Sequence, residues 1–221
     1  MNNIPVYLSQ GGTATLILRE IPHKKTAYII LRSFLPQMLP LMIQDCVDFC
    51  KGCGAEQCLL SSEDPDVKIS LPKAYEILIM QGNKAQLPPL DTPAILSPVT
   101  PENDSIYQRI YNQCFGTVSH ALTYEHAQLE RIYREGHHAF LALTPEEQPW
   151  GMGELHTNEL AAVGILPEFR GQGKRLTLSL LRHCPGPELT LTVVSDNQKA
   201  IGLYEALGFR ITGTESTWYQ A

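Results

Sequence analysis

The run from Glu159 to His183 constrains the fold more than any other part of this sequence. Small and apolar residues over 159–165 predict a strand, Gly171 and Gly173 predict a turn, and the leucines at 176, 180 and 181 predict a helix over 174–183. The first backbone N–H groups of a helix have no intrahelical acceptor, and the helix dipole adds about half a positive charge there. Because the two glycines leave these groups uncovered, the turn suits a diphosphate.

Two common phosphate-binding motifs do not describe this turn, since it lacks both a third glycine and a Gly-Lys-Ser/Thr triplet. Instead, Arg170-Gly-Gln-Gly-Lys-Arg175 resembles the Arg/Gln-x-x-Gly-x-Gly/Ala acetyl-CoA signature of the GNAT N-acetyltransferase superfamily. Further along, Asn197-Gln-Lys-Ala-Ile-Gly-Leu-Tyr-Glu-Ala-Leu-Gly-Phe209 resembles the second signature of that family, Asn-x-x-Ala-x-x-Leu-Tyr-x-x-x-Gly-Phe. The resemblance extends from Ala94 to Tyr219.

This resemblance implies the GNAT acyltransferase fold, an α/β architecture with a mixed sheet and helices on its faces. It also implies an enzyme that transfers the acetyl group of acetyl-CoA to a primary amine of a small molecule or peptide, by direct attack in a ternary complex. A non-catalytic CoA-binding or regulatory module with the same fold is the alternative. The coenzyme contacts implied by the resemblance are Val163, Gly164, Ile165, Arg170, Gly171, Gln172, Gly173, Lys174, Arg175, Leu176 and Asn197.

Two catalytic roles follow from the same resemblance. Tyr204 matches the tyrosine that similar enzymes use as a general acid towards the departing thiolate, although its helical neighbours also suit a core position. Glu159 stands where one branch of the superfamily carries its general base, and Glu154 on the preceding predicted strand is the rival. Either carboxylate can instead be a charge at the end of a hairpin.

The sequence allows more than one interpretation at each of three positions. Arg175 replaces the final glycine or alanine of the first signature, where it can crowd a diphosphate or pair with a phosphate. Gly164 suits a bulge or a close backbone approach, or else the packing of a helix above it. Ser195 and Gln198 form a predicted capping box, which places Asn197 in the first helical turn, where it contacts the coenzyme, initiates the helix, or does both.

The first half predicts a strand–strand–helix–strand–strand lobe with a helix over 37–51, and with no counterpart of the glycine turn. Five prolines between residues 82 and 101 indicate a linker. We therefore expect a degenerate GNAT-like lobe over 1–88 and a catalytic domain over 89–221.

The cysteines at 46, 50 and 53 have a spacing that superficially matches an iron–sulfur site. They also continue the apolar stripe of the predicted helix, so we expect buried thiols and no metal site. The formal charge of −6 argues against non-specific nucleic-acid binding. No signal peptide or membrane span is evident in the sequence, so a cytoplasmic protein that does not bind membranes is expected. The oligomeric state is not readable from it.

Overall fold

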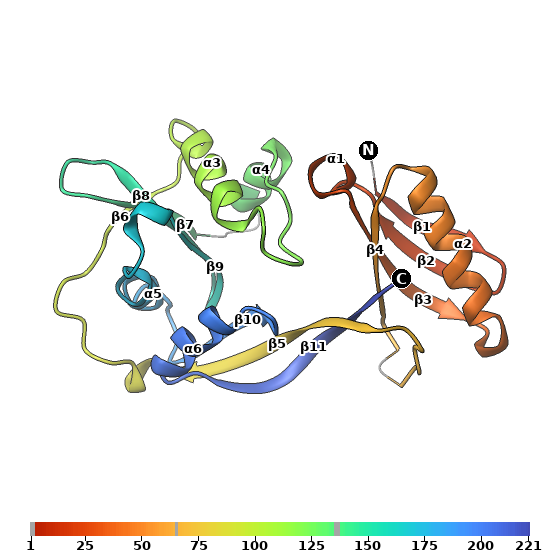
Figure 1. Cartoon of the computed structure of the whole chain (residues 1–221). Helices are drawn as coiled ribbons and strands as arrows, with labels where there is room; N and C mark the ends of the chain where they lie inside the picture. Colours follow the sequence, from red (N-terminus) through yellow and green to blue (C-terminus); the bar gives the residue numbers. More distant parts are fainter. Residues whose placement is uncertain (1–2, 65, 135–137) are drawn as a thin grey trace. The chain divides into compact units, whose positions relative to one another are not determined.

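The computed structural model describes residues 3–64, 66–134 and 138–221, and it divides into two compact units (Figure 1). The first unit contains the chain up to Ile77 together with Thr214–Ala221, and the second contains Leu78–Gly213. Two long strands, β5 (Lys73–Asn83) and β11 (Arg210–Gln220), run through these boundaries. The compact units therefore divide at 77/78 and 213/214, whereas the proline-rich run predicts a domain boundary at 88/89.

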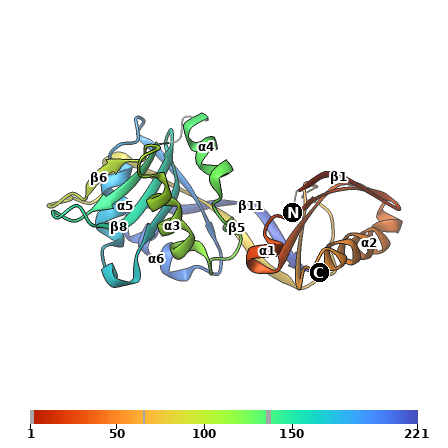
Figure 2. The ribbon, with the colours of Figure 1, turned by 90° about the horizontal axis from the view of Figure 1, so that it is seen from above.

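In the first unit the strand order is β1-β2-β3-β4-β11. The pairs β1–β2, β2–β3 and β4–β11 are antiparallel, and β3–β4 is parallel. Helix α2 packs on one face of the sheet, where Met42, Cys46 and Cys50 are buried with Leu16 and Ile29 (Figure 2). The elements are β1 (Ile4–Ser9), β2 (Gly12–Ile17), α1 (Ile21–Lys24), β3 (Thr26–Phe34), α2 (Leu39–Gly52) and β4 (Gln57–Ser62).

In the second unit the strand order is β11-β5-β10-β9-β8-β7-β6. The strands β6 to β9 form an antiparallel meander, and β9 and β10 are parallel. The elements are β6 (Ile95–Pro98), α3 (Asp104–Phe115), α4 (His126–Arg134), β7 (His138–Leu143), β8 (Pro149–His156), β9 (Glu159–Ile165), α5 (Gly173–Leu181), β10 (Glu188–Val194) and α6 (Gln198–Ala206).

Two apolar cores cover the two faces of this second sheet. One contains Leu176 and Leu180 of α5, Tyr204 of α6 and Leu155 of β8. The other contains side chains of α3 and α4 against Met152 of β8 and partners on β7 and β9. Helices α3 and α4 therefore cover one face, and α5 and α6 cover the other (Figures 1 and 2).

The predicted mixed α/β architecture is confirmed, but several local predictions are wrong. The strand β1 was not predicted, because Pro5 is unfavourable in a strand and residues 4–8 are apolar without any alternation of apolar and polar residues. The sequence Pro22-His23-Lys24-Lys25 predicts a turn after a strand that ends at Ile21, whereas Ile21–Lys24 form the short helix α1, which Lys25 caps with φ +55°. The capping box at Ser195 was also wrong, as described below for α6.

Candidate active site

The parallel strands β9 and β10 pair only at their beginnings. Their ladder consists of Glu159 opposite Thr190 and Leu160 opposite Leu191. Beyond these residues the two strands diverge, although β9 continues to Ile165 and β10 to Val194. The divergence leaves backbone groups of both strands without a partner across this gap, and an extended ligand can pair with them as an added strand.

A β-bulge lies where the divergence begins. Glu154 of β8 pairs with Ala162, and Leu155 pairs with Leu160, so Ala161 is the extra residue on β9. A bulge at Gly164 was therefore wrong. Gly164 is instead a packing glycine, because a Cβ there would lie 2.8 Å from the Cβ of Cys114 on α3. The neighbouring Val163 and Ile165 are half-buried on the opposite face of β9.

The glycine turn has the geometry that anion binding requires. Gly171 has φ +98°, a left-handed conformation that favours glycine, and a Cβ at this position would meet open space. Helix α5 begins at Gly173, after Gln172 as the N-cap residue. The amide of Leu176 donates to the Gln172 carbonyl at 3.0 Å, so the amides just before it have no helical acceptor. Arg170 and Lys174 are exposed beside these donors.

Arg175 points away from the donors of this turn. Its Nε donates to the Thr92 carbonyl at 3.1 Å, and one of its terminal nitrogens donates to the Pro93 carbonyl at 2.9 Å. Its guanidinium carbon also lies 5.9 Å from the ring centre of Trp150, within the range of a cation–π contact. The side chain thus fastens the proline-rich segment to α5, and only the backbone of Arg175 faces the predicted diphosphate position.

Asn197 caps α6, in place of the predicted Ser195. Its side-chain oxygen accepts a hydrogen bond from the Ala200 amide at 3.2 Å. Gln198, predicted as the partner of Ser195 in a capping box, donates its side-chain amide to the Ser195 carbonyl at 2.7 Å. Helix initiation is therefore one role of Asn197, and its side-chain NH₂ group is the part left to meet a ligand.

Tyr204 is buried on α6, with 8% of the residue exposed. Its ring centre lies 6.2 Å from that of Phe209, and its hydroxyl has no hydrogen-bond partner among the described residues. Burial raises the pKa of Tyr204 to about 12, so the phenol keeps its proton throughout the physiological pH range. Leu203, the preceding residue, contacts the start of α5, since a Cβ on Gly173 would lie 3.3 Å from its Cδ2.

The two candidate bases have different surroundings. Glu159 is half-buried at the start of β9, in the closed part of the β9–β10 ladder. Glu154 is buried, and its Oε2 accepts hydrogen bonds from the hydroxyls of Tyr107 at 3.0 Å and Tyr124 at 2.7 Å. Its cross-strand partner is Ala162, next to the bulge. Burial, reinforced by Glu154, holds the pKa of Tyr107 well above its ordinary value.

The tyrosines around Glu154 could not be predicted as a cluster from the sequence. Tyr124 lies in the segment that joins α3 to α4, and Asn112 of α3 holds it by two hydrogen bonds to its backbone, at 2.8 and 2.9 Å. Its ring stacks on Tyr111 with centres 3.6 Å apart. In the same segment, Ser119 donates to the carboxylate of Asp196, just after β10, at 2.9 Å. The segment thus links α3 to the end of β10.

The first unit contains a second parallel strand–helix–strand segment, β3-α2-β4. Its ladder runs without a break from Thr26 opposite Gln57 to Leu31 opposite Ser62. Prolines stand at the beginning of both the short 3₁₀ turn (Pro36–Met38) and α2, where they supply no N–H. This copy therefore has neither the gap nor the donors of the β9-α5-β10 segment.

Two of the three cysteines expected to be buried are so, whereas Cys53 is half-buried at the residue after α2. Cys46 and Cys50 are buried in α2, and burial raises the pKa of Cys46 to about 12. Across residues 3–64, 66–134 and 138–221, no three His, Cys, Asp or Glu side chains are grouped so as to hold a metal ion. Within the same described ranges, no helix combines the length and the apolar character needed to cross a membrane.

Comparison with known proteins gives the family. Residues 104–209 match the model of the acetyltransferase (GNAT) family. Peptidyl-lysine N-acetyltransferase YjaB of Salmonella typhimurium is 31% identical over 111 residues, which cover 49% of this chain and 75% of that protein. This chain belongs to the GNAT acetyltransferase family.

Solved structures show the same fold along the chain. A functionally unknown conserved protein from Staphylococcus epidermidis has a TM-score of 0.62 at 13% identity, covering 97% of this chain and 91% of that one. A GCN5-related N-acetyltransferase from Sphaerobacter thermophilus has a TM-score of 0.58 at 13% identity, covering 95% and 76%. The predicted superfamily and fold are confirmed, and the roles of single residues stay predictions.

Proposed function

We propose that this chain transfers the acetyl group of acetyl-CoA to a primary amine of a small molecule or peptide. The observation that carries the proposal is the gap between β9 and β10, which opens beyond Leu160 and leads to the amide donors at Gly173. In this arrangement the gap takes the extended pantetheine arm and the turn takes the diphosphate. A lysine side chain is the first acceptor to test, because the Salmonella relative bears the name of a peptidyl-lysine acetyltransferase.

The reaction we propose is a direct attack of the amine on the thioester. The amine nitrogen forms a bond to the acetyl carbon, and the bond from that carbon to sulfur breaks. The nitrogen loses a proton to a carboxylate, directly or through water, and the sulfur leaves as a thiol. Tyr204 donates its phenolic hydrogen towards the departing sulfur, a role for which its raised pKa keeps the hydrogen in place.

A route through an acetylated cysteine is disfavoured by Cys114, the cysteine that contacts β9. Its side chain packs against Gly164, and burial raises the pKa of its thiol to about 11. The thiolate, which is the nucleophilic form, is therefore scarce at neutral pH. Replacing Cys114 by Ala should leave turnover within about twofold; a loss of the order expected for a nucleophile would reinstate the acyl-enzyme route.

Turnover with a panel of amines tests the function. Release of the CoA thiol and the mass of the acetylated product are followed with lysine peptides, peptides with free N-termini, and small amines. Acetylation of at least one amine well above thioester hydrolysis is expected. Tight acetyl-CoA binding without any amine-dependent turnover would instead favour the non-catalytic module.

Paired variants distinguish the two bases. Glu159→Gln and Glu154→Gln each remove a charge while keeping an oxygen acceptor, and the Gln at 154 can still accept from Tyr107 or Tyr124. The variant that lacks the base should lose about 100-fold or more in kcat/KM at neutral pH. That loss should shrink as the pH approaches the pKa of the amine, because less of the acceptor then needs deprotonation. A loss that is the same at every pH would indicate a structural role.

A further inference from the structure

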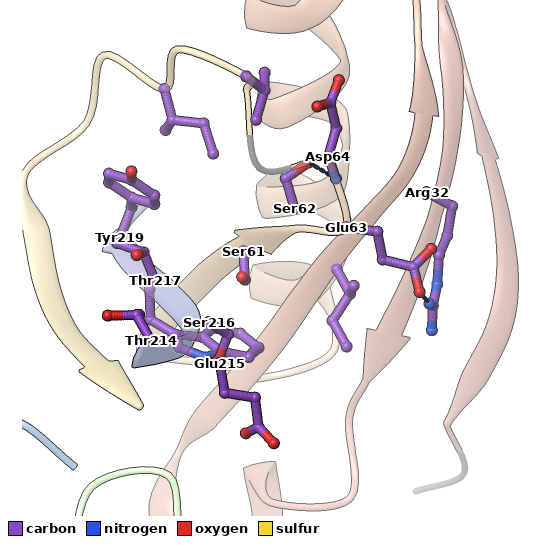
Figure 3. A pocket seen from close by; sticks show the side chains of 14 residues that line it. Arg32, Ser61, Ser62, Glu63, Asp64, Thr214, Glu215, Ser216, Thr217 and Tyr219 are labelled. Atoms are coloured by element: carbon purple, nitrogen blue, oxygen red, sulfur yellow. Dashed lines mark hydrogen bonds and ion pairs between the residues drawn. The ribbon is translucent and has the colours of Figure 1, made fainter. Parts of the chain in front are cut away.

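A pocket lies wholly within the first unit, where β4 and β11 stop pairing (Figure 3). Their ladder holds Leu60 opposite Tyr219 and Leu59 opposite Gln220. The next residue of β4, Ser61, borders the pocket, together with parts of β3, the segment after β4 and the C-terminal half of β11. The volume is about 630 Å³, which lies within the range of small-molecule sites.

Most of the polar side chains that line the pocket carry hydroxyl groups, and most of these hydroxyls make no hydrogen bond to the described residues. Ser62 accepts from the Asp64 amide, and Ser216 accepts from the indole N–H of Trp218. The remaining hydroxyls have no hydrogen-bond partner among the described residues; they belong to Ser61, Thr214, Thr217 and Tyr219.

Ser61 is the most informative of these hydroxyls, because only 4% of the residue is exposed. The Ser61 Oγ is not among the fully buried polar atoms that lack a hydrogen-bond partner, so this atom is open to the pocket and to whatever fills it, while the rest of the residue is covered. Figure 3 shows Ser61 between the Arg32–Glu63 pair on one side and Thr217 and Tyr219 on the other. A ligand hydroxyl in this pocket would supply the missing partner.

The charges of the pocket favour a cation. The Arg32 guanidinium is engaged by the Glu63 carboxylate and by the Thr15 hydroxyl, so this pair is neutral. Asp64 and Glu215 also line the pocket, and neither makes an ion pair among the described residues. The lining therefore carries a net negative charge, while Ile30 and Trp218 add apolar surface.

We propose that this pocket binds a small polyhydroxylated amine, such as an amino sugar. The free hydroxyls match a ligand with several hydroxyl groups, and the carboxylates of Asp64 and Glu215 match its ammonium group. Binding requires neither acetyl-CoA nor the residues of the acetyl-transfer site. This binding site therefore goes beyond the proposed acetyl transfer, and its test does not depend on whether that reaction occurs.

Glucosamine and glucose form a matched pair of probes, because they differ at one position by the amino group. Calorimetry on the full chain without acetyl-CoA should show saturable glucosamine binding, at least about threefold tighter than that of glucose. Ser61→Ala should weaken both sugars about fivefold, by the loss of one hydrogen bond. Glu215→Gln should weaken glucosamine about threefold and leave glucose unchanged.

Glu146→Gln is the matched control, since it makes the same charge change on an exposed turn of the second unit and should change neither affinity. Circular dichroism and melting curves verify that each variant is folded, and Thr217→Val is the second pocket variant if Ser61→Ala does not fold. Absence of saturable glucosamine binding to the wild-type chain would overturn the proposal. So would a Glu215→Gln variant that loses glucose and glucosamine equally, or pocket variants that bind as the wild type does.

Discussion

Restoring the family signature at Arg175 should cost stability without improving coenzyme binding. The signature has Gly or Ala at this position, so sequence comparison alone would predict that Arg175→Gly tightens the hold on acetyl-CoA. In the structure the guanidinium is turned to the carbonyls of Thr92 and Pro93, and only the amide of residue 175 is left to the diphosphate. Removing the side chain therefore opens no additional space at the donors.

The cost in stability can be worked out from these contacts. The two hydrogen bonds lie near the surface and together should contribute about 1 kcal/mol after screening by solvent. The contact with Trp150 adds about 0.5 kcal/mol. Arg175→Ala should thus lower the free energy of unfolding by about 1.5 kcal/mol. Glycine in a helix costs about 1 kcal/mol more, which gives about 2.5 kcal/mol for Arg175→Gly.

Urea and thermal denaturation followed by fluorescence measure the change in stability, and calorimetry with acetyl-CoA measures the change in affinity. The melting temperature should fall by about 3–6 °C for Arg175→Ala. The acetyl-CoA affinity of both variants should stay within about twofold of the wild type. A tenfold gain in affinity for Arg175→Gly would show that the side chain obstructs the coenzyme, and unchanged stability would show that its contacts contribute nothing.

Four further outcomes follow. Tyr204→Phe should lower kcat about 100-fold with little effect on acetyl-CoA affinity. The control Tyr133→Phe, on the exposed side of α4, should leave kcat unchanged. Equal kcat values for the two variants would exclude Tyr204 from the mechanism. Because its pKa is raised from about 10 when unfolded to about 12 when folded, Tyr204 stabilises the fold below pH 10, and this contribution is lost as the pH rises to 12. Between pH 10 and 12 the unfolding free energy of the wild type should fall by about 2 kcal/mol relative to Tyr204→Phe, and parallel pH dependences of the two would contradict the raised pKa. Gly164→Ala should lower the free energy of unfolding by about 1–3 kcal/mol. Adding Cys114→Ala should not restore it, since the Cβ of Cys114 is the nearest atom to a new Cβ at position 164. Full restoration would show that the clash is with the sulfur instead. Calorimetry should give one acetyl-CoA per chain, because β3 and β4 leave no gap, and two would mean that the first unit opens.

The elements of the second half could be predicted because each carries its own periodicity. The run of small and apolar residues predicted β9 at Glu159–Ile165, and the leucines of α5 predicted its buried face. The bulge at Ala161 could not be predicted from the sequence, because a bulge depends on the register in which β8 pairs with β9. The N-cap of α6 was missed for a different reason: Ser195 and Asn197 are both good capping residues, and the structure uses the one that reaches the Ala200 amide.

The parts of the site that sequence reasoning missed are contacts between distant residues. Arg175 binds carbonyls more than 80 residues earlier in the chain, and Tyr124 binds Glu154 across 30 residues. A signature reports which residue types recur near a ligand, but it says nothing of which way an unusual side chain turns. Glu154 could be named as a candidate from its strand, whereas the hydroxyls that hold it come from α3 and from an irregular segment with no periodicity.

The two strand–helix–strand segments of this chain differ in the feature on which the proposed coenzyme site depends. Both have parallel strands joined by a helix that packs on the sheet, so the architecture alone does not define a site. In β3-α2-β4 the ladder stays closed up to Ser62, and prolines remove donors where the helix begins. In β9-α5-β10 the bulge at Ala161 begins the divergence, and Gly171 turns the chain so that free amides follow. A closed ladder offers no backbone groups to an extended ligand, so the bulge and the glycine turn together, rather than the helix, are the reason for proposing the second segment as the place for acetyl-CoA.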